Sequence, residues 1–307
     1  MATNNFKAFA LAPNANVMSQ ANWEALPALL SGFTAGKASS AQVNKAIRQA
    51  SFIASCLAQF VCDASGQDVL DDGDQAQFIM NLIAAFDSQY TGRLIKTTAI
   101  KTSQTFVKDP KMKFCRVRIV GGGGGAGGVP STTSWGTASI SGGGGAGAYA
   151  EVLLTAGAVP SSVSVIIGSG GIPQATAGAD GSASSFGNII ICPGGKKSAV
   201  GVLITTASSL SMGAQGSEAP TINSGVVLFS TPGSGGGYAI YTAAGITGGA
   251  GGDSFMGAGG PARYAGSGTQ AGGGPGAGGA GVAIGANSIA LNGGSGIDGR
   301  CIIEEYA

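Results

Sequence analysis

The chain has 307 residues, among them 57 glycines and no histidine, with 10% charged residues and a formal net charge of +1. The lack of histidine excludes Ser-His-Asp and Cys-His nucleophiles, imidazole acid–base chemistry and histidine-ligated metals. The 44% hydrophobic content argues against a solvated disordered polymer.

Residues 1–90 are predicted to form an α-helical domain. Ser39 or Ser40 can cap a helix that runs through residues 41–62. Its apolar residues are spaced alternately by four and three, as in an a/d seam: Val43, Ile47, Ala50, Ala54, Leu57 and Val61. This seam packs either inside its own domain or on copies of itself about a symmetry axis, and both alternatives stay open.

A second helix is predicted from "DDGDQAQFIMNLIAAF", where Asp72 can cap and Gln75 occupies the capping-box position. The amino terminus is too weakly apolar for a secretory signal, and no run of about 18 apolar residues marks a membrane span. We therefore expect a chain that is not exported by a signal of its own.

Residues 91–120 are predicted to be a basic β-strand neck. Alternation in "CRVRIV" places Arg116 and Arg118 on one face and the apolar residues on the other, as in a half-buried strand. A solvated strand face is favoured over a nucleic-acid site, because no aromatic residues are interleaved with the charges. The basic residues of the segment are Arg93, Lys96, Lys101, Lys108, Lys111, Lys113, Arg116 and Arg118.

Glycine is concentrated from residue 121 onward, since only five of the 57 glycines precede it: Gly32, Gly36, Gly66, Gly73 and Gly92. The runs at 121–128 and 141–148 have equal length, and a strand-like segment adjoins each, so they can lie antiparallel. A flexible linker would favour Gly with Ser and would not need matched runs. We therefore predict that residues 121–307 form packed polyglycine II helices with connecting loops and with interposed β-strands such as "SVSVIIG" and "GVVLFS".

No catalytic, cofactor-binding or metal-binding residues are predicted. Glu304 and Glu305 are adjacent acids, but strand alternation would point them to opposite faces. The five cysteines lack a C-x-x-C pair, which argues against a zinc site or a disulfide framework and favours buried thiols in a reducing compartment. "ICPGGKKS" lacks the first glycine of a P-loop.

The pattern "VRIVGGGGGAGG … GGGGAGAYAEVLL … VSVIIGSGG", ending in "GGSGIDGRCIIEEYA", resembles the glycine-rich tip domains of bacteriophage tail-fibre and adhesin proteins. The segment "FKAFALAPNANVMSQANWEALPALL" and the helix after it are similar to attachment regions of tail fibres from phages and prophages of enteric bacteria. The resemblance implies an elongated fibre of the virion, assembled in the host cytoplasm. It is commonly a homotrimer, bound at its amino terminus to a baseplate or tail protein.

The same resemblance implies a non-catalytic receptor-binding domain over residues 121–307, whose distal loops bind a receptor on the host surface. These loops carry little charge, which favours an outer-membrane protein and is also compatible with a neutral lipopolysaccharide sugar. Nucleic acid is not an expected partner. Exposed loops on a rigid scaffold are where binding residues concentrate. The candidates are therefore the loop aromatics and one arginine, namely Trp135, Tyr241, Arg263, Tyr264 and Phe255, whereas Tyr149 and Phe186 are assigned to the fold.

Two other functions compete with this one. A purely structural polyglycine-helix protein, ice-binding or wall-like, would show flat and regular faces, whereas the loops here differ in length and content. An enzyme that degrades polysaccharide would need a cluster of carboxylates, which the sequence does not contain.

Overall fold

A computed structural model describes residues 2–33, 38–89, 92–205 and 208–307. The chain divides into two compact units, Met1–Arg93 and Leu94–Ala307. Among the described residues, no helix is both long and apolar enough to cross a membrane.

The first unit contains α1 (Gln20–Glu24), α2 (Ala28–Ser31), α3 (Ser40–Ser65) and α4 (Gln75–Gln89). Ser39 caps α3 with a complete capping box to Gln42, so the first of the two predicted caps is confirmed. The cap predicted for α4 is wrong: the side chain of Asp74 accepts a hydrogen bond from Gln77 N (2.9 Å), whereas Asp72 accepts from Asp74 N. Asp74 directly precedes the helix, and only that position lets a side chain reach the free N–H groups.

The apolar seam of α3 is buried at one end only. Val61, Ala58 and Cys62 pack with Phe78 and Leu82 of α4. Val43, Ile47 and Leu57 are between 37% and 44% exposed, and Ala50 and Ala54 are exposed as well, so packing within the unit covers the seam only at Val61.

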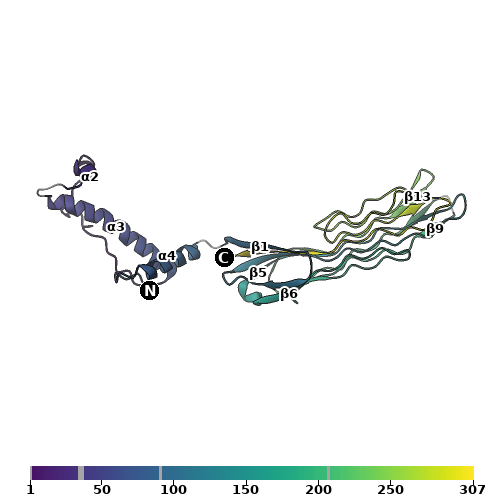
Figure 1. Cartoon of the computed structure of the whole chain (residues 1–307), viewed down its shortest axis with the longest axis horizontal. Helices are drawn as coiled ribbons and strands as arrows, with labels where there is room; N and C mark the ends of the chain where they lie inside the picture. Colours follow the sequence, from purple (N-terminus) through teal and green to yellow (C-terminus); the bar gives the residue numbers. More distant parts are fainter. Residues whose placement is uncertain (1, 34–37, 90–91, 206–207) are drawn as a thin grey trace. The chain divides into compact units, whose positions relative to one another are not determined.

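Two five-stranded antiparallel sheets pack face to face at one end of the second unit (Figure 1). The first has the order β1 (Leu94–Ile100), β16 (Arg300–Tyr306), β3 (Phe114–Val120), β5 (Tyr149–Thr155), β12 (Val226–Thr231). The second has the order β11 (Thr221–Ile222), β8 (Ile190–Cys192), β7 (Ser184–Phe186), β6 (Ser162–Ile166), β2 (Gln104–Val107).

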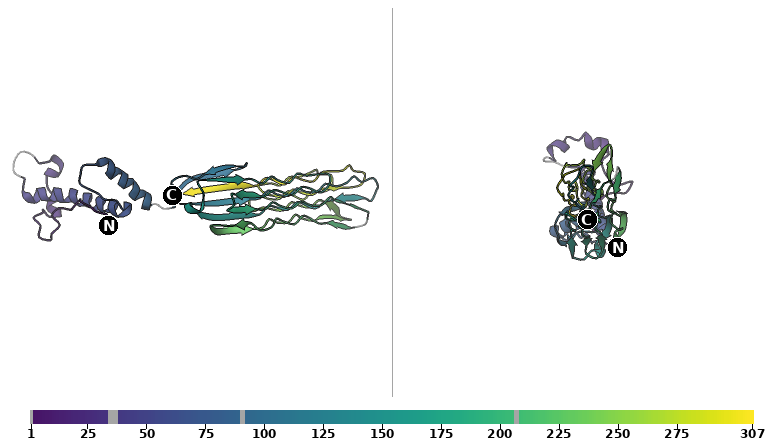
Figure 2. Two further views of the ribbon diagram at one scale, coloured as in Figure 1. Left: turned by 90° about the horizontal axis from the view of Figure 1, so that it is seen from below. Right: turned by 90° about the vertical axis from the view of Figure 1, so that its right-hand side faces the viewer.

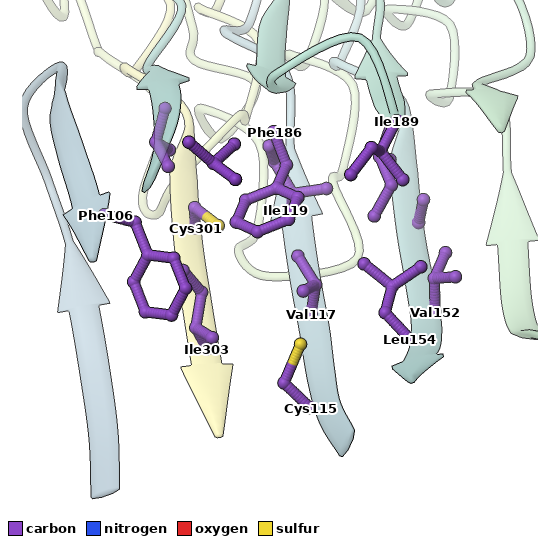
Figure 3. Packing of buried hydrophobic residues seen from close by; sticks show 14 of the residues in the cluster. Phe106, Cys115, Val117, Ile119, Val152, Leu154, Phe186, Ile189, Cys301 and Ile303 are labelled. Atoms are coloured by element: carbon purple, nitrogen blue, oxygen red, sulfur yellow. The ribbon is translucent and has the colours of Figure 1, made fainter. Parts of the chain in front are cut away.

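The core of this unit lies between the two sheets. Val117, Ile119 and Ile303 of the first sheet face Phe106 and Phe186 of the second (Figure 3). The predicted alternation in β3 is confirmed, because its apolar residues are buried while Arg116 and Arg118 lie on the opposite face. Glu305 is buried and Glu304 lies on the outer face, as strand alternation predicts.

Two three-stranded antiparallel sheets form the opposite end of the same unit (Figure 1). They have the orders β10 (Ser209–Ser211), β13 (Ala239–Thr242), β14 (Gly245–Thr247) and β15 (Ala283–Ile284), β4 (Ala138–Ile140), β9 (Val202–Ile204). Ile140, Ile204, Ala239 and Ala283 form one buried cluster that both sheets share.

Extended glycine-rich segments connect the two ends and lie side by side, as Figure 2 shows from a second direction. The N–H groups of one run donate in turn to three different neighbours: Gly124 to Gly145 O (2.7 Å), Gly125 to Ala179 O (2.9 Å) and Ala126 to Gly294 O (2.9 Å). Gly121 N also bonds to Ala148 O, so the antiparallel pairing of residues 121–128 with 141–148 is confirmed. The backbone of this run is therefore satisfied by distant segments and is not a free linker.

Side chains would not fit between these segments. A Cβ added to Gly124 would overlap the carbonyl oxygen of Lys196, and one added to Gly144 would overlap that of Gly124. Glycine is thus required here by close approach of one backbone to another.

The predicted fold class, an elongated and trimeric fibre of packed polyglycine II helices, is wrong. The regular structure in the described residues of Leu94–Ala307 is four antiparallel sheets, and its one helical element is the 3-10 turn η1 (Ala156–Ala158). Apolar segments that flank the glycine runs pair as strands and bury one face, and this determines the architecture. The single described chain gives no evidence of a trimer.

The strands β1, β2 and β3, which cover much of the basic segment 91–120, are members of the two five-stranded sheets. β1 and β3 lie on either side of β16, and β2 is an edge strand of the second sheet. They therefore belong to the same compact unit as the glycine-rich segments.

Candidate functional site

We define the loop end as the two three-stranded sheets together with the loops 129–137, 261–269 and 285–292. Thr132 joins two of these loops. Its hydroxyl donates to Gly285 O (2.6 Å) and accepts from Ser288 N (3.0 Å), while its own N–H donates to Ser288 O (2.9 Å). Thr132 is 3% exposed, so this connection is shielded from water and holds the two loops in one arrangement.

Trp135 lies in a tight turn of the first loop. Thr137 donates to Ser134 O from its hydroxyl (2.6 Å), and Gly136 has a φ of +77°, which side-chain-bearing residues rarely adopt. The turn presents the indole outward, and Trp135 is 90% exposed. A large apolar ring held in solvent by a closed turn has no packing role in this chain.

The three other candidate binding residues at the loop end have surroundings that differ from those of Trp135. Tyr264 is 73% exposed, and its backbone pairs with Thr247 of β14. Arg263 is also exposed, and its carbonyl accepts from Gly248 N (2.8 Å). Tyr241 of β13 is half-buried against the cluster around Ile140, so part of its side chain stabilises the loop end itself.

Apolar residues that sequence reasoning missed extend this surface. Ile289 is 79% exposed in the loop that Thr132 anchors. Leu210 of β10 pairs directly with Ile240 of β13, and both side chains are exposed. Further exposed apolar residues here are Val202 and Leu203 of β9, with Val200, Met212 and Tyr238 beside the strands. Short strands of mixed character carry little periodic signal, and only the exposure of one sheet face reveals these residues.

The loop end carries almost no charge. In the stretches 129–141, 200–212, 238–248, 261–270 and 283–292, the sequence contains one charged residue, Arg263. Without a charged field, this surface has no electrostatic attraction for a strongly ionic target. Its chemistry is suited to apolar and neutral hydrogen-bonding groups.

In a comparison with protein families, residues 98–306 match a glycine-rich domain. The chain belongs to this glycine-rich domain family. The matched part, hereafter the glycine-rich domain, includes both ends of the second unit. Comparison with curated proteins gives no match.

Phe255 lies away from the loop end, on the outer face of the first five-stranded sheet of the glycine-rich domain. Its ring stacks on Tyr149 of β5, with 4.2 Å between ring centroids, and also contacts Phe229 of β12. The structure therefore brings Trp135, Tyr241, Arg263 and Tyr264 to one end but places Phe255 elsewhere. Tyr149 and Phe186 are both buried.

Ion pairs lie on the same outer face of this sheet. Arg116 Nε donates to Glu151 Oε1 (2.7 Å), and Arg118 Nη2 donates to Glu304 Oε1 (2.6 Å). The hydrogen bond to Glu151 raises the pKa of Arg116 above its usual value. Burial, followed by the hydrogen bond to Glu151, raises the pKa of the Tyr149 phenol. Arg116 and Arg118, two of the basic residues of the segment 91–120, are therefore already paired with carboxylates within the sheet.

The thiols of the glycine-rich domain are unsuited to nucleophilic chemistry. Burial raises the pKa of Cys115 and of Cys192 to about 12, and it also raises the pKa of Cys301. The nucleophilic form is the thiolate, which is scarce at neutral pH when the pKa is raised. These cysteines act as small apolar side chains of the core.

Proposed function

We propose that this chain is a non-catalytic receptor-binding protein of the phage tail-fibre type, and that the loop end of its glycine-rich domain contacts the bacterial surface. The single observation that carries the proposal is Trp135, 90% exposed in a closed turn at the loop end. Tryptophan, tyrosine and arginine supply most of the energy at recognition surfaces, and Tyr264 and Arg263 lie at the same end.

The ordering of the loop end supports the same function. Binding costs less when the contacting loops are already held in place. Here Thr132 connects two loops, and the glycine segments that lead to the loop end are hydrogen-bonded to one another. The low charge favours loops of an outer-membrane protein or neutral sugars over the anionic core of lipopolysaccharide.

The test uses fluorescently labelled full-length chain on a panel of enteric bacterial cells. We expect saturable binding that weakens about 30-fold or more in Trp135→Ala, the size of effect typical of a central aromatic contact. Phe9→Ala removes an exposed aromatic residue of the first unit and is the matched control, expected to bind normally. Binding that is equal for Trp135→Ala and the unaltered chain contradicts the proposed site.

Treatment of the cells distinguishes the receptor classes. Loss of binding after protease treatment identifies a protein receptor, and loss after periodate oxidation identifies a sugar. A chain that binds none of the cells, at concentrations where it is folded, contradicts the receptor-binding function and favours a structural role for the glycine-rich domain.

A further inference from the structure

A hollow of about 290 Å³ lies on the glycine-rich domain where the first five-stranded sheet meets the glycine segments. Arg118, Arg300 and Ile302 line it from β3 and β16. Tyr149, Phe255, Met256 and Pro275 line the remainder. The hollow thus combines two guanidinium groups with an aromatic and aliphatic wall.

The two guanidinium groups of the hollow lack some of their hydrogen-bond and ion-pair partners. Arg118 bonds to Glu304, but Arg300 takes part in none of the ion pairs found among the described residues. The Nε atoms of both Arg118 and Arg300 are buried without a hydrogen-bond partner. Buried donors without acceptors are unfavourable, and most such groups in proteins find a partner.

The two arginines are close neighbours by strand register. Ile302 lies opposite Arg118, and Arg300 lies opposite Val120, so Arg300 is the diagonal neighbour of Arg118 on the same face. Three arginines on this face, Arg116, Arg118 and Arg300, stand against two glutamates, Glu151 and Glu304. One positive charge is left over, and it is that of Arg300.

The opposite wall is held in place by its own hydrogen bonds. Ser254 Oγ donates to Pro275 O (2.5 Å) and accepts from Met256 N (3.2 Å). These bonds fix the turn that stacks Phe255 on Tyr149. The wall is therefore ordered before any ligand arrives.

We propose that this hollow binds the anionic group of a small acidic saccharide, a carboxylate or a phosphate carried on one sugar ring. Guanidinium groups bind both anions through paired hydrogen bonds, and Arg300 supplies the uncompensated charge. The apolar wall of Phe255, Ile302 and Pro275 contacts the ring. The volume is at the lower limit for small-molecule sites, so the ligand is the size of a single sugar.

This site is separate from the loop end and does not rest on the function proposed above. Its ligand is strongly ionic, whereas the loop end carries one charged residue. An Arg300 variant therefore leaves cell binding through Trp135 intact if both proposals hold.

The experiment titrates the full chain with glucuronate, glucose 6-phosphate, inorganic phosphate and glucose, followed by ligand-observed NMR. We expect one site per chain for at least one of the two charged sugars and no binding of glucose. Arg300→Gln is expected to weaken that binding about ten-fold or more, because a charge-assisted hydrogen bond is lost. Arg300→Lys keeps the positive charge, and we expect it to retain part of the binding.

Preference for glucuronate identifies a carboxylate ligand, and preference for glucose 6-phosphate identifies a phosphate. Arg93→Gln, at an exposed ion pair with Asp87, is the matched arginine control and is expected to bind as the unaltered chain does. The proposal is overturned if neither charged sugar binds, if Arg300→Gln binds as well as the unaltered chain, or if inorganic phosphate alone binds as tightly as the sugars.

Discussion

The ring of Phe255 stacks on the ring of Tyr149 with 4.2 Å between centroids and 20° between planes. Tyr149 is 2% exposed although it faces the outer side of its sheet, because the rings of Phe255 and Phe229 help to shield it. An aromatic residue from a glycine-rich loop is thus part of the packing of the sheet. It is not a free contact at the loop end.

Phe255→Ala is expected to lower the free energy of unfolding by at least about 1 kcal/mol, because aromatic pairs contribute roughly that much in addition to the burial that is also lost. Cell binding should be unchanged, since the loop end is left intact. Thermal unfolding and the binding assay are measured together with Trp135→Ala, which should show the reverse pattern. Weakened cell binding by folded Phe255→Ala would place the recognition surface on the sheet.

Gly144→Ala is expected to destabilise the glycine-rich domain by about 1–3 kcal/mol or more, the range for forcing extra atoms into a packed interior. The new methyl group would overlap the carbonyl of Gly124 on the neighbouring segment. Gly157→Ala is the control, because an added Cβ there meets no atom within 4 Å. Equal melting temperatures for the two variants would show that the segments are loosely packed.

Cysteine labelling should distinguish the exposed thiol of the first unit from the buried thiols of the second. Cys56 is exposed on α3, whereas Cys115, Cys192 and Cys301 are buried in the core of the second unit. We expect iodoacetamide to modify Cys56 in the folded chain, and the three core thiols only after unfolding. Mass spectrometry of digested samples gives the extent at each site, with Cys62, which is buried in the first unit, as an internal reference. Rapid modification of Cys192 in the native chain would contradict the packing of the two sheets.

Stability should fall at alkaline pH. The pKa of Cys115 and of Cys192 is about 12 in the folded chain against an ordinary value of 9, so the unfolded state loses these protons first. Their contribution is fully present below pH 9 and is lost as the pH rises from 9 towards 12. Denaturant unfolding at pH 8, 9.5 and 11 measures this decline, and Cys192→Ala should reduce its slope. A slope that is the same in Cys192→Ala would assign the decline to other groups.

Ser39→Ala is expected to destabilise α3 by about 1 kcal/mol, because it removes the capping box to Gln42. Ser39→Asp should restore most of the loss, since aspartate caps as well as serine does. Helical circular dichroism during thermal unfolding follows this change. No difference between Ser39→Ala and Ser39→Asp would show that the cap is not needed.

Local patterns were sufficient for several elements. A cap at Ser39 or Ser40, the strand alternation around Arg116 and the opposite orientations of Glu304 and Glu305 all follow from residue spacing within one segment, and the structure selects Ser39. The antiparallel pairing of the first two glycine runs also follows, because equal lengths on either side of one loop allow it. The fold class did not follow, because the short strands pair with segments far along the chain and no spacing within one segment specifies those partners.

The sequence by itself determined that the chain has a helical part and a glycine-rich part, and it contains no histidine for common catalytic chemistry. Only the tertiary structure decided which distant segments meet: Thr132 with Gly285, 153 residues along the chain, Phe255 with Tyr149, and Arg300 beside Arg118. Equal length indicates a partner only for the two runs that flank one loop, residues 121–128 and 141–148. The other glycine runs are nearly identical as local sequence, so they do not encode their own partners. Strand pairing and burial at the two ends of the domain select those partners, and these are long-range interactions.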